Sequence, residues 1–177
     1  IETWSEILLR MENSKLLIKA PSEDAEIAQE NILKSFKNLK IDNSRIIFLP
    51  REKERINHYK VYNKVDISLD TFPYSGVTTS IESIWMGVPV LTMQGTNFTS
   101  RCGESINLNL KMSEFIAKDE NDYINKAVSI SKDYKNLITI RKTLREKAYN
   151  SPLFDNKSFG DDFSNLLNEI WSLHSSK

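Results

Sequence analysis

The hydrophobic positions along the chain follow two different spacings. Short, continuous apolar runs are typical of buried strands, and stretches with an apolar residue every three or four positions indicate amphipathic helices. The runs predict strands over residues 15–20, 45–50, 65–70, 88–93 and 114–117. The helical spacing predicts helices over residues 2–11, 58–63, 78–86, about 100–108, 121–132, 135–150 and 159–174. A further long helix is expected to be capped by Ser22, with a stripe of Ile27, Ile32, Leu33 and Phe36.

Strands that alternate with helices indicate βαβ units. The expected fold class is therefore α/β, a Rossmann-like parallel sheet flanked by helices. We expect residues 1–177 to form one domain, with the core over about 12–120 and C-terminal helices over about 121–175. These helices are expected to pack back across the sheet or onto a domain outside the chain. Because the first residue is not methionine and the chain opens inside a helix, a longer parent protein is expected.

Composition narrows the classes of partner. Lys and Arg together number 24, as do Asp and Glu, so the formal net charge is zero and no global field attracts nucleic acid. No apolar run approaches the ~20 residues that span a bilayer, so no membrane partner is expected. Cys102 is the single cysteine, which favours a reducing, cytoplasmic compartment, and we expect it to be a buried structural thiol. The three tryptophans, Trp4, Trp85 and Trp171, fall on apolar stripes and are expected in the core.

The loop over 69–82 carries the strongest chemical signal, because in parallel sheets ligands bind beyond the carboxyl ends of the strands. Gly76 permits a tight turn, after which Val77, Thr78 and Thr79 present backbone N–H groups at a helix N-terminus. Such an end binds anions, and the two hydroxyls add donors for phosphate. Glu82, one turn further, suits the hydroxyls of a ribose. The alternative is that Thr79 and Glu82 form a capping box and only satisfy the helix end.

Two other loops offer polar groups at strand ends. The loop over 50–59 carries His58 and basic residues that can face a base and ribose, although a solvated charge run with a histidine at a helix start explains it equally. The loop over 93–101 can reach a sugar or phosphates, or cap the next helix. The histidines show no metal-ligand spacing, and neither a dinucleotide fingerprint nor a P-loop is present. These observations predict no metal site.

The segment over 65–90, VDISLDTFPYSGVTTSIESIWMGVPV, resembles the signature of the O-GlcNAc transferase / Spindly family, glycosyltransferase family 41. The similarity continues through Ser100-Arg101, 115–117, 151–155 and Ile170-Trp171, and covers about nine-tenths of the chain. It implies the C-terminal domain of a GT-B glycosyltransferase, whose nucleotide sugar lies in a cleft between two Rossmann-like domains.

The resemblance also implies roles, position by position. Thr78 and Thr79 would hold the diphosphate, Glu82 the ribose hydroxyls and His58 the uracil. The further donor-binding positions are Pro50 and Arg51 beside the base, Arg55 beside the ribose, and Gly76 and Val77 in the turn. The sequence departs from the family at Val77, where animal members carry histidine, at Val61, where an arginine helps to read uracil, and at Ser75, usually asparagine. The resemblance therefore does not imply the contacts that those family side chains make.

The implied function is the UDP-sugar-binding half of an inverting glycosyltransferase that transfers a sugar, GlcNAc by resemblance, to Ser or Thr hydroxyls of proteins. The family's catalytic lysine falls upstream of this chain, so no catalytic residue is assigned and the chain alone is expected to be inactive. No cofactor is expected, and no Asp-x-Asp metal motif occurs. The implied partners are a protein acceptor, an N-terminal catalytic domain and tetratricopeptide repeats.

Three alternatives stay open. One is a non-catalytic nucleotide-sugar-binding or interaction module on the same fold. The second is a GDP-fucose-type transferase domain, since some members of the family use that donor. The third is another Rossmann-like enzyme such as an epimerase, which would need an acid or base within the chain.

Overall fold

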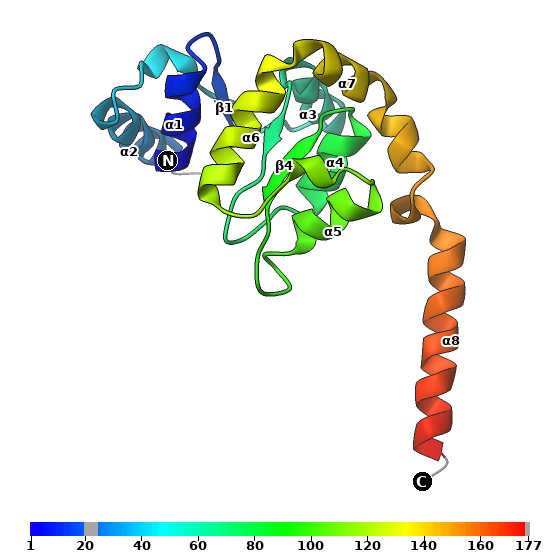
Figure 1. Cartoon of the computed structure of the whole chain (residues 1–177). Coiled ribbons are helices and arrows are strands. Elements are labelled where there is room, and N and C mark those ends of the chain that lie inside the picture. The colour runs from blue at the N-terminus through cyan, green and yellow to red at the C-terminus, as the bar shows by residue number, and fades with distance from the viewer. Residues whose placement is uncertain (20–24, 176–177) are drawn as a thin grey trace.

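Helices surround short parallel strands in the computed structural model, which describes residues 1–19 and 25–175 (Figure 1). The strands are β1 (Leu16–Ile18), β2 (Ile46–Phe48), β3 (Ser68–Leu69), β4 (Val90–Met93) and β5 (Ile116–Ala117). The helices are α1 (Glu2–Arg10), α2 (Ala25–Asn38), α3 (Arg55–Lys60), α4 (Thr78–Trp85), α5 (Cys102–Asn109), α6 (Glu120–Lys132), α7 (Tyr134–Tyr149) and α8 (Asn156–Ser175). Short 3₁₀ turns are η1 (Asn43–Arg45), η2 (Val61–Lys64), η3 (Ser113–Phe115) and η4 (Pro152–Phe154). The predicted α/β class is confirmed.

The strands pair in parallel, as predicted, but in two groups. β1 pairs with β2, and β3, β4 and β5 form a second sheet in that order. β3 is shorter than the predicted strand over 65–70. In the part of that segment that does not pair, the guanidinium of Arg141 donates to the carbonyl oxygens of Val65 and Asp66. Among the described residues, no strand pairing joins the two groups.

Three clusters of buried side chains hold the elements together. The first lies between β4, α4, α5 and α7, and includes the fully buried Ile84 and Leu110. The second joins α1 and α6 to the central strands around Tyr123. The third packs α1 and α2 on β1 and β2 around Phe36, with Ile32 and Leu33 against it. The helices at 121–132 and 135–150 therefore pack back on the sheet as predicted, as α6 and α7.

The tryptophans do not share one environment. Trp4 is half-buried against the third cluster, and Trp85 lies between Phe154, at 4.9 Å between ring centroids, and the guanidinium of Arg145. Both positions confirm a packing role. Trp171, however, is 69% exposed, so its expected place in the core is wrong for the described chain. The periodicity of its helix identified an apolar face but not what covers that face.

Helix α8 projects away from the rest of the molecule (Figure 1). It meets the body at η4 and does not pack back across the sheet, so the first of the two expected placements is wrong for this helix, while packing onto a domain outside the chain stays a prediction. Its apolar side chains are at least half exposed, and they are Phe159, Phe163, Leu166, Leu167, Ile170, Trp171 and Leu173. The rings of Phe159 and Phe163 stack on each other along this stripe.

Several element boundaries differ from the predictions. α3 begins at Arg55 rather than at His58, because residues 55–57 already have helical backbone geometry, and the preceding Glu54 is extended. Ile27 is 68% exposed and does not belong to the packed stripe of α2. The predicted cap at Ser22 lies outside the described residues. Gly87 ends α4 as predicted, with a φ of 78° that disfavours residues with a Cβ.

Candidate functional site

In each group of strands, the polar loops named from the sequence leave the carboxyl ends of the strands. Because the strands within each group run parallel, Lys19 follows the carboxyl end of β1 and Pro50 that of β2, while Asp70 and Gln94 follow β3 and β4. These ends are where parallel α/β sheets bind their ligands. The site is therefore built from loops that the strands position.

Asp70 organises the loop after β3. Its Oδ1 accepts a hydrogen bond of 2.7 Å from the backbone N–H of Gly76, and its Oδ2 accepts one of 2.9 Å from the hydroxyl of Thr92. The hydroxyl of Tyr123 donates to the backbone carbonyl of Asp70 at 2.8 Å. The side chain is buried, and the hydrogen bonds of its carboxylate hold the backbone of residues 70–76 in place. No role for Asp70 was predicted from the sequence, although an acidic residue at the end of a buried strand is a signal for one.

Burial raises the pKa of the Asp70 carboxyl above its ordinary value of 3.8, and the hydrogen bonds from Gly76, Thr92 and Thr71 oppose that rise. The folded protein therefore binds this proton at a higher pH than the unfolded chain does. The protonated carboxyl contributes stability that is fully present below pH 3.8 and is lost as the pH rises through the folded pKa.

We expect the free energy of unfolding of the wild type, minus that of Asp70→Asn, to fall as the pH rises above 3.8. The amide does not titrate, so the difference isolates this one group. Urea unfolding of both proteins over a series of pH values measures it. A difference that stays constant with pH would contradict the assigned direction of the shift.

The N-terminus of α4 is open to a ligand. Val77 is the N-cap, the helix starts with the bond from the N–H of Ile81 to the carbonyl of Val77 at 3.0 Å, and no side chain caps the end. Thr78 and Thr79 are exposed beside it. The capping box is therefore wrong, because Thr79 lies inside the helix rather than at its N-cap. The first-turn N–H groups lack the side-chain partner that a capping box would supply.

Gly76 allows the turn that leads into α4 to close. A Cβ at this position would lie 2.6 Å from Oγ1 of Thr79 and 2.8 Å from Oγ of Ser80. The backbone of the loop thus approaches the first turn of the helix more closely than a side chain would permit. The close approach agrees with the tight turn predicted at Gly76, and residues 77–79 beside it are exposed.

The carboxylate of Glu82 lies against His58. Nε2 of His58 and Oε2 of Glu82 are 3.0 Å apart, and the side chains are 26% and 21% exposed. His58 also contacts the rings of Tyr59 and Tyr62, at 5.6 Å and 5.7 Å between centroids. The reading of His58 as part of a solvated run at a helix start is therefore wrong, because it lies in the last turn of α3 and is half-buried. The structure brings together two residues that the sequence placed in separate loops.

Tyr62 reflects the same environment. Burial, followed by the negative charge of Glu82 and then by Tyr59, raises the pKa of its hydroxyl to about 12. The phenol is therefore neutral at physiological pH. It forms an apolar wall beside the imidazole with which its ring makes an edge contact.

The other positions named from the sequence lie around this pair. Arg55 is exposed, and its Nε donates to the hydroxyl of Tyr59 at 2.6 Å while the guanidinium lies 5.4 Å from that ring. Pro50 and Arg51 are exposed after β2 and take no part in the contact between His58 and Glu82.

The loop after β4 is bonded mainly within itself. Buried Glu104 accepts hydrogen bonds from Gln94 at 2.9 Å and from Arg101 at 3.0 Å. The hydroxyl of Ser75 donates to the carbonyl of Thr99 at 2.8 Å, which ties this loop to the loop after β3. Cys102 begins α5 half-buried, so its placement as a buried thiol is wrong. Its Sγ contacts the carbonyl of Phe98 at the surface of the loop.

Two hollows lie away from these residues. One of about 320 Å³ lies between α1 and α6, and one of about 270 Å³ lies between the end of α4 and α7. Neither is lined by Glu82 or His58. Within residues 1–19 and 25–175, no three His, Cys, Asp or Glu side chains are grouped so that they could hold a metal ion. In the same residues, no helix has the length and apolar character to cross a bilayer.

Comparison with known proteins identifies the family. The model of "Glycosyl transferase family 41" matches residues 1–163. A protein of Eustoma exaltatum subsp. russellianum, named "Probable UDP-N-acetylglucosamine--peptide N-acetylglucosaminyltransferase SPINDLY", is 34% identical over 171 residues, which are 97% of this chain and 19% of the relative. The "UDP-N-acetylglucosamine--peptide N-acetylglucosaminyltransferase" of Caenorhabditis elegans is 29% identical over 99% of this chain and 15% of its own length.

A solved structure agrees with these relatives. A mutant of the Thermobaculum terrenum O-GlcNAc transferase superposes with a TM-score of 0.89 at 27% identity, over 96% of this chain and 32% of its own. This chain therefore spans less than a fifth of the length of the curated relatives named above. With a family model that matches nearly the whole chain, and a fold shared with a solved member, the chain belongs to glycosyltransferase family 41.

Proposed function

We propose that this chain binds the nucleotide-sugar donor of an inverting glycosyltransferase, a UDP-sugar, for transfer of N-acetylglucosamine to Ser or Thr hydroxyls of proteins. One observation carries the proposal. The open N-terminus of α4, with the exposed hydroxyls of Thr78 and Thr79, lies one turn from the contact between Glu82 and His58. An anion site and a carboxylate beside an aromatic wall are the two recognition elements that a nucleoside diphosphate requires.

The parts of the donor match this arrangement. The diphosphate would accept hydrogen bonds from the first N–H groups of α4 and from the two threonine hydroxyls, with the helix dipole favouring its charge. From Thr79 to Glu82 the helix rises about 4.5 Å, which is the scale of the link between a diphosphate and its ribose. The ribose hydroxyls would donate to Glu82, and the base would lie towards His58 and the loop that carries Pro50 and Arg51.

In the proposed reaction, the hydroxyl oxygen of the acceptor attacks the anomeric carbon of the sugar, its proton passes to a base that we assign to the parts of the protein outside this chain, and the bond to the diphosphate breaks. The configuration at that carbon inverts, and UDP leaves with the electron pair of the broken bond. The N–H groups of α4 stabilise the charge that develops on the diphosphate, in the manner of an oxyanion hole. Since no Asp-x-Asp motif occurs in the sequence, we propose that this stabilisation is independent of metal.

We assign catalysis and acceptor binding to residues outside the proposed site. The names of the relatives supply the sugar and the peptide acceptor, and this chain matches under a fifth of each. We assign the catalytic lysine, the acceptor surface and the second wall of the cleft to the parts of those proteins that this chain does not match.

We expect UDP to bind this chain, GDP to bind it more weakly, and Glu82→Ala to lower the affinity for UDP by about 10-fold to 100-fold. Loss of a charged hydrogen-bond acceptor costs about 1.5–3 kcal/mol, which corresponds to such a factor. Thr79→Ala removes one neutral donor and is expected to weaken binding by about fivefold. Calorimetric titration with both nucleotides, up to millimolar concentration, measures these affinities.

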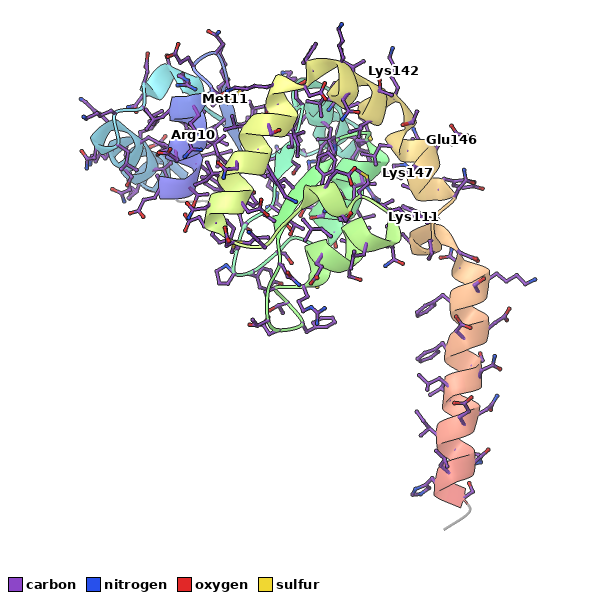
Figure 2. The ribbon with its side chains drawn as sticks, viewed as in Figure 1. Arg10, Met11, Lys111, Lys142, Glu146 and Lys147 are labelled. Carbon is purple, nitrogen blue, oxygen red and sulfur yellow. The ribbon has the colours of Figure 1, made fainter. Side chains whose placement is uncertain are left out.

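Matched controls lie on α7. Glu146→Ala and Thr143→Ala remove the same side chains from exposed positions and should leave the affinity for UDP unchanged; Glu146 is labelled in Figure 2. The proposal fails if neither nucleotide binds, or if the control variants weaken binding as much as the site variants do. A higher affinity for GDP would instead support a GDP-sugar donor.

A further inference from the structure

His58 is held from both sides. The ammonium of Lys19, the residue that follows β1, contacts Nδ1 of the imidazole. On the other side of the ring, Nε2 lies 3.0 Å from Oε2 of Glu82. The three side chains form a continuous series, and they come from the end of β1, from α3 and from α4, which are far apart in the sequence.

The chemistry of these groups fixes the proton. A lysine ammonium carries three hydrogen-bond donors and no acceptor, so Nδ1 of His58 must be the acceptor in the contact with Lys19. The single ring proton of the neutral imidazole then lies on Nε2, where it donates to the carboxylate of Glu82. The position of Lys19 therefore determines which tautomer faces Glu82.

We propose that Lys19 is a positioning residue for nucleoside recognition, which it achieves by locking His58 as the neutral Nε2–H tautomer. The locked ring in turn orients the Glu82 carboxylate. The bond to His58 occupies Oε2, and the other oxygen has no protein partner among the described residues, so it can accept from a ribose hydroxyl. This inference rests on the proposed function, and it deepens that function by adding a residue which acts on the nucleoside through His58.

A simpler role for a lysine at this position is direct contact with the diphosphate. A free ammonium near the N-terminus of α4 would act directly on the diphosphate as a point charge. The observed contact with Nδ1 favours the indirect role, because it directs the ammonium to the imidazole. The two roles predict different responses to nucleotides with and without phosphate.

The first test needs no ligand and reads the ¹⁵N signals of the histidine rings at about pH 8.5, where free imidazoles are neutral and lysine side chains are still ammonium groups. The chain contains only two histidines, and exposed His174 on α8 serves as the internal reference. We expect His58 to show the Nε2–H tautomer alone, and His174 to show the mixture of a free imidazole. Lys19→Met should shift the Nδ1 signal of His58 towards that of His174, while Lys19→Arg should restore it. Unchanged signals in Lys19→Met would overturn the proposal.

The second test compares uridine with UDP by ligand-detected titration. We expect Lys19→Met to weaken both by the same factor, about fivefold to tenfold, because the effect passes through the nucleoside site. Lys142→Met, at an exposed position of α7 labelled in Figure 2, should change neither. A loss for UDP that far exceeds the loss for uridine would show direct contact with the diphosphate and refute the indirect role. If the wild type binds neither molecule, the proposed function fails, while the ring signals still decide the role of Lys19.

Discussion

Asp70→Ala is expected to lower the free energy of unfolding by about 3 kcal/mol and to abolish binding of UDP. The carboxylate accepts from the N–H of Gly76 and from the hydroxyl of Thr92, both inside the protein. Alanine leaves these donors without a partner. It also removes the hydrogen bonds that fix the orientation of the backbone of residues 76–79. The cost is smaller than the sum of the charged hydrogen bonds, because the buried carboxylate is itself desolvated.

Asp70→Asn is the matched control. Its Oδ1 can still accept from the N–H of Gly76, and the hydroxyl of Thr92 can turn to accept from the new amide. We expect a loss of about 1 kcal/mol with UDP binding retained. Urea unfolding and calorimetry of both variants measure the two effects. If the two variants lost equal stability and equal affinity for UDP, the negative charge of Asp70 would matter and its hydrogen bonds to the loop would not.

Gly103→Ala is expected to destabilise the protein by about 3 kcal/mol through overpacking. Gly103 lies in α5, at the point where this helix approaches β4. An added Cβ would lie 2.2 Å from Oγ1 of Thr92, 2.8 Å from its Cβ and 2.6 Å from Oδ2 of Asp70. These atoms are buried and hydrogen-bonded to each other, so they cannot move aside cheaply.

Gly160→Ala separates packing from helix propensity. Gly160 lies in α8, and a Cβ there meets nothing within 4 Å. Alanine should therefore stabilise that helix by about 0.5–1 kcal/mol through the unfolded chain. The same propensity gain acts at Gly103, so the difference between the two variants in thermal unfolding measures the packing cost. A Gly103→Ala protein as stable as the wild type would refute the close approach of α5.

The sequence predicted those parts of the molecule that depend on neighbouring residues. The turn at Gly76, the helix after it and its end at Gly87 are local in sequence, and the structure has all three. Within this helix, the sequence also identified Glu82 and the threonines as a candidate site. The order of strands and helices was predictable for the same reason, because each element carries its own periodicity.

Features that depend on distant residues were not predictable. Lys19 and His58 are 39 residues apart, and no periodicity links them. The capping-box prediction failed because Val77 and not Thr79 is the N-cap, and because the carboxylate of Glu82 has its partner on α3. The role of Asp70 required knowing that Thr92 lies on the neighbouring strand. The contacts of Arg141, a side chain from α7, with the carbonyl oxygens of Val65 and Asp66 were not predictable for the same reason.

The projection of α8 has a consequence for spectroscopy. This helix meets the body at η4, so its local unfolding is weakly coupled to the loss of the buried clusters. The fluorescence of Trp4 and Trp85 reports on the body, whereas that of Trp171 reports on the helix. The total emission of the chain is then a sum of two transitions rather than one cooperative signal. Trp171→Phe removes the signal of the helix. The emission of this variant then measures the unfolding of the part of the protein that carries the site.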